Sequence, residues 1–169
     1  MADRIRLEPM SEAQFQESLE QGIVRLAAEM TRRGHWTEAE SRESARSEFA
    51  QMLPEGGRTA NRRFRVIVDA ESGRRVGETW CTVRPYGGKV QYWVDWLGID
   101  APYRRQGFGR AALRALAEEA ARDGADRIGL SVISDNGPAR ALYEQMGFRD
   151  ETRRMILRFR EPPPAPPAP

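Results

Sequence analysis

The segment Val90–Arg122 constrains the fold of this chain more than any other part of the sequence. It begins with Val90–Ile99, whose aromatic and branched side chains predict a buried strand. A basic loop with two glycines follows, and Gly107–Arg122 then places apolar side chains at helical spacing. A strand, a glycine loop and an amphipathic helix in succession predict a sheet with a helix packed on it.

Further strands and helices are predicted on both sides of this segment. Ile5 and Leu7 alternate with charged residues and predict a strand. Ser11 and Thr37 are placed to begin two helices, which end near Gly34 and Met52. The other predicted elements are strands at Phe64–Val68 and Val76–Val83, a strand at Ile128–Ile133, a helix at Pro138–Met146, and strands at Gly147–Phe148 and Met155–Phe159.

The predicted order is therefore β-α-α-β-β-β-α-β-α-β-β. Strands interspersed with helices indicate an α+β domain built on a mixed sheet. The length of 169 residues and mass of 19.2 kDa fit a single domain, which we expect over residues 1–160. Residues 162–169 are proline and alanine only, so residues 161–169 are expected to be a disordered tail.

Composition excludes several classes of protein. No window approaches ~20 apolar residues, and the N-terminus lacks the apolar stretch of a signal peptide, so we expect a cytoplasmic protein with no membrane segment. A single cysteine, Cys81, excludes a disulfide framework within one chain, and a single histidine leaves few ways to bind a metal. The net charge of +2 is weak evidence for a nucleic-acid partner, and none is expected.

The loop Arg104–Arg110 has the chemistry of a phosphate site. A helix N-terminus presents free N–H groups and a positive dipole end, and glycines let a phosphate approach the backbone. Three arginines add positive charge. The loop is not a Walker motif, because no Gly-Lys-Ser/Thr follows, and Ala112 stands where a dinucleotide fingerprint has its third glycine.

A second informative block, Asn136–Phe148, follows the strand at Ile128–Ile133. Its tyrosine, Tyr143, lies near the middle of a short predicted helix. A phenol ordinarily loses its proton only near pH ~10, so it is protonated at neutral pH and can donate a proton to a leaving group. In isolation, a core tyrosine with a satisfied hydroxyl is the more ordinary interpretation.

The two blocks together resemble the GCN5-related N-acetyltransferase (GNAT) superfamily. Arg104-x-x-Gly107-x-Gly109 is similar to its Arg/Gln-x-x-Gly-x-Gly/Ala loop, and Asn136–Phe148 resembles its N-x-x-A-x-x-L-Y-x-x-x-G-F block. The resemblance covers roughly Phe64–Phe159. It implies a mostly antiparallel central sheet flanked by helices, and acetyl-CoA as cosubstrate with no metal. It also implies that a homodimer is possible.

The resemblance also implies roles for single residues. Tyr143 becomes the general acid that protonates the CoA thiolate, and Asn136 a contact of the pantetheine arm. That arm fills the gap where a bulged strand parts from the strand that contains Leu130. The residues implied for acetyl-CoA binding are Leu97, Gly98, Ile99, Arg104, Arg105, Gln106, Gly107, Phe108, Gly109, Arg110 and Asn136.

The general base and the acceptor site are less well defined. The two positions where members of this superfamily carry a catalytic glutamate are Trp93 and Ser131 here. Asp95 is the candidate base, although it can equally bind the ammonium group or anchor a loop, and a water chain is a further alternative. Cys81 is interpreted as a buried structural thiol. The candidate acceptor-binding residues are His35, Trp36, Glu78, Trp80 and Trp93.

The leading hypothesis is an N-acetyltransferase that moves an acetyl group from acetyl-CoA to a primary amine in a ternary complex. The acceptor is a small molecule or a protein N-terminus. The segment 11–56 holds nine acids and five bases, which could help to attract a cationic acceptor. The alternative is a non-catalytic acyl-CoA-binding sensor module that keeps the phosphate loop.

Overall fold

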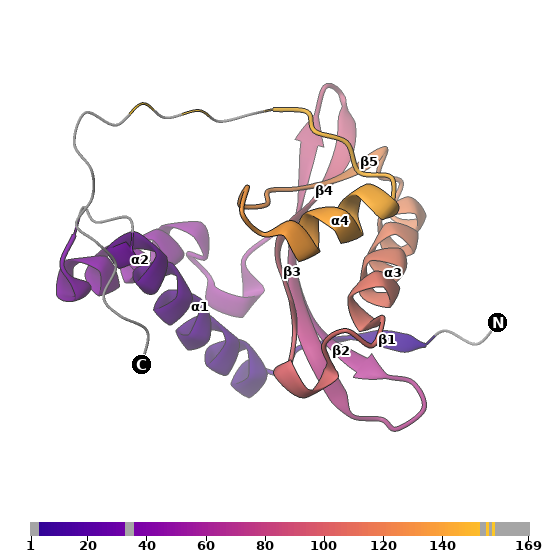
Figure 1. The fold of residues 1–169 in the computed structure, drawn as a ribbon, viewed down its shortest axis with the longest axis horizontal. Helices are drawn as coiled ribbons and strands as arrows, with labels where there is room; N and C mark the ends of the chain where they lie inside the picture. Colours follow the sequence, from indigo (N-terminus) through magenta and orange to yellow (C-terminus); the bar gives the residue numbers. More distant parts are fainter. Residues whose placement is uncertain (1–3, 33–35, 153–154, 156, 158–169) are drawn as a thin grey trace. The chain divides into compact units, whose positions relative to one another are not determined.

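The computed structural model describes residues 4–32, 36–152, 155 and 157, and its elements follow the predicted order through the fourth helix (Figure 1). The chain forms two compact units: a sheet unit of residues 4–10 and 60–151, and a helical unit within residues 11–59. The strands are β1 (Ile5–Pro9), β2 (Arg62–Asp69), β3 (Arg75–Tyr86), β4 (Lys89–Ile99) and β5 (Arg127–Leu130). The helices are α1 (Glu12–Arg32), α2 (Glu38–Met52), α3 (Phe108–Arg122) and α4 (Gly137–Gln145).

The sheet has the strand order β1-β2-β3-β4-β5. Neighbouring strands from β1 to β4 are antiparallel. Hairpins join β2 to β3 and β3 to β4, whereas α1 and α2 lie between β1 and β2 in the chain. Strand β5 is parallel to β4, since α3 carries the chain back between them. The prediction of a mixed, mostly antiparallel sheet with helices is confirmed.

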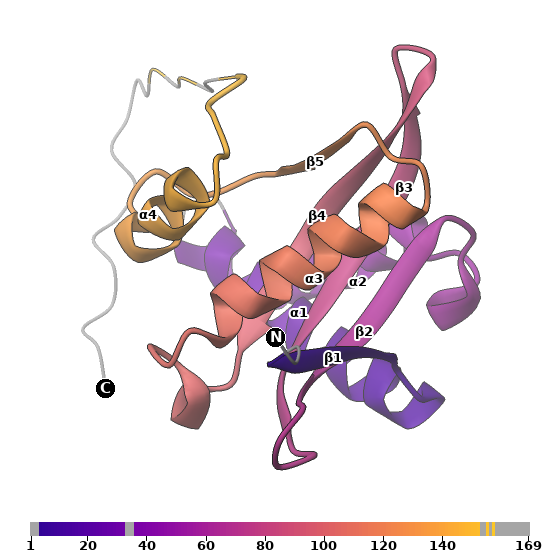
Figure 2. The same cartoon turned by 90° about the vertical axis from the view of Figure 1, so that its right-hand side faces the viewer.

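Helix α3 crosses one face of the sheet (Figure 2). Its apolar stripe predicts this, because residues four apart lie on one side of a helix. Phe108 and Ala112 pack with Ile5 and Ile67 at one end of α3, and Leu116 packs with strand residues at the other. The second group also contains Cys81, Tyr92, Val94 and Ala120.

The two helices of the helical unit begin where the sequence predicts. The Thr37 hydroxyl accepts a hydrogen bond from the Glu40 N–H while the Glu40 carboxylate accepts one from the Thr37 N–H, which is a complete capping box. Ser11 and Gln14 make the same reciprocal pair before α1. None of the described helices is long and apolar enough to cross a membrane.

The structure departs from the prediction near the C-terminus. Strand β5 ends at Leu130 rather than Ile133. Residues 148–152 form no strand, because Gly147 has φ +91° and the Phe148 N–H bonds back to the Tyr143 carbonyl, so this segment turns at the end of α4. Most of the strand predicted at Met155–Phe159, and the tail at 161–169, lie outside the described residues.

Candidate functional site

Strand β4 has two halves with different neighbours. In the paired half, Lys89–Val94, the residues Gln91–Val94 pair with β5 on one edge while β3 pairs on the other. In the open half, Asp95–Ile99, β3 continues alongside, but the described part of the chain supplies no strand on the opposite edge. Backbone groups on that edge are therefore available to a ligand that lies along the strand.

A β-bulge separates the two halves. Trp80 pairs with Trp96 while the next β3 residue, Cys81, pairs with Val94, so Asp95 is the extra residue of β4. The bulge lies two residues before Leu97, and Leu97–Ile99, which the resemblance assigns to acetyl-CoA binding, lie in the open half. The extra residue bends the strand, which explains why β5 stops pairing at Val94.

The open half of β4 lies closer to β3 than a side chain at Gly77 would allow. A Cβ at Gly77 would lie 2.2 Å from the carbonyl oxygen of Gly98, so Gly77 must be glycine for the two strands to meet. Gly98 itself lies under the Trp96 ring, 2.8 Å from the position of a Cβ. Leu97 and Ile99 point to the other face and pack against the α3 cluster.

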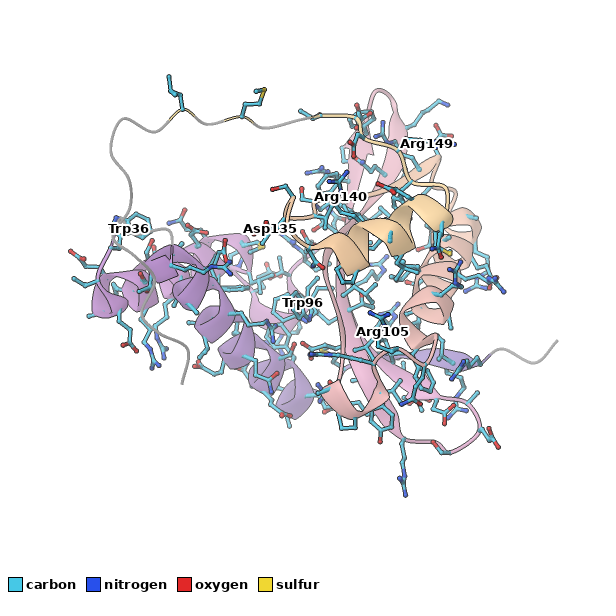
Figure 3. All side chains as sticks on the ribbon, in the orientation of Figure 1. Trp36, Trp96, Arg105, Asp135, Arg140 and Arg149 are labelled. Carbon is cyan, nitrogen blue, oxygen red and sulfur yellow. The ribbon has the colours of Figure 1, made fainter. Side chains whose placement is uncertain are left out.

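The loop between β4 and α3 is held by its own side chains. The Arg104 Nε–H donates to the Ile99 carbonyl at 2.9 Å, and the Gln106 Nε2–H donates to the Pro102 carbonyl at 2.8 Å. Arg105 has φ +61°, a left-handed conformation that is uncommon for a side chain of its size (Figure 3). These bonds fix the loop that enters α3.

The N-terminus of α3 has no side-chain cap. Its N-cap is Gly107, with φ +86°, and within the residues that the structure describes no side chain caps its first turn. Because the partial charge at this end of the helix is positive, these N–H groups form a site for an anion. The side chain of Phe108 is buried in the core, so at this residue only the backbone faces the anion site.

Arg4 brings a further guanidinium to this end of α3, and sequence analysis did not identify it. Its Cζ lies 4.3 Å from the centre of the Phe108 ring, and its Nη1 is 3.1 Å from the position of a Cβ at Gly107. Arg4 precedes β1 and is far from the loop in the sequence, so no local pattern connects the two. Only the packing of α3 against β1 brings them together.

The Arg110 side chain contacts the end of α4. Its Nη2–H donates to the Gln145 Oε1, and its Nη1 lies 3.8 Å from the Met146 sulfur, both at the C-terminal end of α4. One residue earlier, a Cβ at Gly109 would lie 3.4 Å from the Leu142 side chain. The first turn of α3 therefore touches α4 directly.

Helix α4 positions the two residues of the Asn136–Phe148 block to which the resemblance gives a role. Asn136 is its N-cap: the Asn136 Oδ1 accepts a hydrogen bond from the Ala139 N–H at 3.3 Å. Tyr143 is half-buried, with its ring centre 5.7 Å from that of Phe148. Burial raises the pKa of the Tyr143 phenol, so the hydroxyl keeps its proton throughout the neutral range.

Two carboxylates lie near the bulge, each held by an arginine. Asp95 Oδ2 accepts hydrogen bonds from the Thr82 hydroxyl at 2.6 Å and from the Arg62 guanidinium at 3.1 Å. Burial raises the pKa of the Asp95 carboxyl above its usual range, although Thr82 and Arg62 act in the opposite direction. Its side chain is 22% exposed, so solvent still reaches it.

The second carboxylate, Glu78, is buried on β3. It accepts hydrogen bonds from the Trp96 indole N–H and from the Arg75 guanidinium, both at 3.1 Å. Glu78 pairs across the strands with Gly98 and is 4% exposed. Its two oxygens are thus both engaged, in contrast to the more open carboxyl of Asp95.

The remaining candidate acceptor residues are dispersed. Trp80 is buried against Phe64 in the core, and Arg84 lies over the Trp93 ring at 4.6 Å. Trp36 belongs to the helical unit and is 45% exposed, and His35 lies outside the described residues. Burial raises the pKa of the Cys81 thiol to about 12, as expected for an inert structural cysteine.

These features combine on one side of the sheet unit. An anion site at the start of α3 follows an open strand edge, and a protonated phenol lies on the helix that touches α3. Such a set can bind a phosphorylated, extended ligand and donate a proton to it. No group of three or more potential metal ligands occurs among the residues that the structure describes.

Comparisons with known proteins agree with this chemistry. A sequence profile of the acetyltransferase (GNAT) family matches residues 24–148. YdgE of Bacillus subtilis, an uncharacterized N-acetyltransferase, is 30% identical over 149 residues, which are 88% of this chain and 94% of YdgE. The [ribosomal protein bS18]-alanine N-acetyltransferase of Escherichia coli is 41% identical over 58 residues, 34% of this chain and 39% of that enzyme.

A solved structure shows the same fold. The crystal structure of the acetyltransferase homologue YycN from Bacillus subtilis superposes with a TM-score of 0.83 at 28% identity. The match covers 93% of this chain and 99% of that one.

Proposed function

The chain belongs to the acetyltransferase (GNAT) family, and we propose that it transfers the acetyl group of acetyl-CoA to a primary amine within a ternary complex. The observation that carries the proposal is the uncapped start of α3, with Gly107 at its N-cap, directly after the open half of β4. A pyrophosphate needs the first of these features, and an extended pantetheine arm needs the second.

The residues present fit acetyl-CoA. Pyrophosphate oxygens would accept hydrogen bonds from the amides of the first turn of α3, close to the Arg105 side chain. The pantetheine amides would bond to the open half of β4, as an added strand does. When bound, acetyl-CoA supplies a thioester whose carbonyl carbon is open to attack by an amine.

The chemical step forms one bond and breaks one. The neutral amine nitrogen attacks the carbonyl carbon, a C–N bond forms, the C–S bond breaks, and the Tyr143 hydroxyl gives its proton to the departing sulfur. The nitrogen loses one proton to water as the amide forms, and the Tyr143 phenolate takes a proton back from solvent. A backbone N–H of the open half stabilises the negative charge on the carbonyl oxygen. Much of the acceleration comes from holding amine and thioester together.

Asp95 is the side chain we propose to receive the proton of the acceptor ammonium, directly or through water. An alkylammonium has a pKa near ~10, so it must lose a proton before it attacks. The raised pKa of Asp95 and its remaining exposure support this role. Glu78 is less suited, because both of its oxygens already accept hydrogen bonds.

The test is an amine panel with detection of thiol release. Purified protein receives acetyl-CoA with free amino acids, polyamines and peptides with a free N-terminus. We expect release of thiol with one class of amine, and a loss of roughly 10²-fold in kcat with little change in the KM for acetyl-CoA in Tyr143→Phe.

The matched control is Tyr86→Phe, which removes the same hydroxyl from an exposed residue at the end of β3 and should leave turnover unchanged. Binding of acetyl-CoA without thiol release on any amine would favour a sensor module instead. Unchanged turnover in Tyr143→Phe would remove that residue from the mechanism.

A further inference from the structure

Helix α4 is held by few contacts in the sheet unit. None of its residues is buried, although Tyr143 is partly covered. Residues 148–152 after it form no strand, and the Arg127–Glu151 ion pair fixes that segment beyond the helix rather than the helix itself. The position of α4 therefore depends on a small number of side chains.

The contacts that join α4 to α3 come from one turn of α3. Arg110 donates to the Gln145 Oε1 and lies 3.8 Å from the Met146 sulfur, and Leu142 packs beside Gly109. Within the residues that the structure describes, no other side-chain hydrogen bond or ion pair joins α4 to the rest of the sheet unit. Arg110 is the polar connection.

The charge of Arg110 suits this place. Its guanidinium meets the C-terminal end of α4, where the helix dipole is negative and a cation is stabilising. Two of its nitrogens already contact residues at the end of α4. Arg104 and Arg105, by contrast, belong to the loop that precedes those amides.

We propose that Arg110 is a positioning residue that holds α4, and with it the Tyr143 hydroxyl, at a fixed place relative to the phosphate-binding end of α3. This inference rests on the proposed function. Tyr143 lies two residues before Gln145 on the same short helix, so a displacement of the helix end displaces the phenol. A shift of about 1 Å in a catalytic group can cost on the order of 10²-fold in rate.

The first experiment separates positioning from phosphate binding. Arg110→Met keeps the aliphatic stem and removes the guanidinium, and Gln145→Leu removes its acceptor. We expect each variant to lower kcat roughly tenfold while the KM for acetyl-CoA stays within about twofold. A large rise in that KM in Arg110→Met alone would show a phosphate ligand and overturn the proposal, as would unchanged kcat in both variants.

A double-mutant comparison tests whether Arg110 acts through Tyr143. In the Tyr143→Phe background, Arg110→Met should lower kcat no further, because the hydroxyl that it positions is already absent. Additive losses would overturn the proposal. The control is Arg114→Met, one turn later on α3, which removes the same charge from an exposed side chain and should leave both constants unchanged.

A measurement without turnover keeps this test independent of the proposed function. Hydrogen–deuterium exchange of the α4 amides should be at least about threefold faster in Arg110→Met than in the unchanged protein, with α3 exchange unaltered. If wild-type protein releases no thiol with any amine, the proposed function fails. The exchange rates of the α4 amides still show whether Arg110 holds α4. Equal exchange in α4 would overturn it.

Discussion

The two halves of β4 share one backbone and one neighbour, β3, yet they differ in almost everything else. The paired half is enclosed by strands on both edges, and Tyr92 and Val94 lie in the core beneath α3. The open half has no second neighbouring strand among the described residues, and its polar residue Asp95 bonds to side chains of β2 and β3. A single extra residue, placed by the bulge, converts a structural strand into one that can receive a ligand.

This comparison separates stability from function along one strand. Closure on both edges satisfies the backbone and excludes a ligand. Opening one edge leaves hydrogen-bonding groups for a substrate, and in the proposed function the neighbouring loop and helix supply charge and a proton. Variants on the β3 side of the open half should therefore change stability, and variants next to its other edge should change ligand binding or turnover.

The largest effect is expected where the open half presses on β3. In Gly77→Ala the new Cβ would meet the Gly98 carbonyl, so the strands must separate, and we expect a loss of about 3 kcal/mol in the free energy of unfolding. The control is Gly73→Ala, in open space with φ +69°, which should cost about 1 kcal/mol. Denaturant unfolding measures both. Equal losses would show that the close approach is unimportant.

The second effect concerns the start of α3. Gly107→Ala places a Cβ 3.1 Å from the Arg4 guanidinium and strains a residue with φ +86°, so we expect affinity for acetyl-CoA to fall about tenfold. Gly124→Ala carries similar strain, with φ +74°, at the other end of the same helix and should leave affinity unchanged. Titration of both variants with acetyl-CoA measures the two affinities. A similar loss of affinity in both variants would show that the effect comes from lower stability alone.

The smallest effect is a shift along the pH axis. Because burial raises the pKa of Asp95, a base at this position loses activity as pH falls through a value above the usual range of about 4. In Asp95→Asn the acidic limb of kcat/KM should move or disappear. A limb that stays in place would assign the base to another group or to water.

The same shift affects stability with the opposite sign. A raised pKa means that the folded chain binds this proton more tightly than the unfolded chain does, so ionisation of Asp95 lowers stability as pH rises through that pKa. Asp95→Asn should lack this decrease, which unfolding curves measured at a series of pH values above about 4 would reveal.

The sequence predicts features that are written in contiguous residues. The order of elements through α4, the starts of α1 and α2 and the α3 stripe follow from spacing within one segment, and the structure contains them. The bulge at Asp95 depends on the register between two strands, which no single strand specifies. Arg4 and the Arg110–Gln145 contact join residues far apart in the chain, so they become visible only in the folded structure.

Pyrophosphate binding at the start of α3 is tested most directly by calorimetric titration with acetyl-CoA and, in parallel, with S-acetylpantetheine, which lacks the phosphates. If the uncapped amides of α3 hold the pyrophosphate, acetyl-CoA should bind at least about tenfold more tightly than the shorter thioester. Equal affinities, or no heat with acetyl-CoA, would contradict the proposal that the first-turn amides of α3 hold the pyrophosphate.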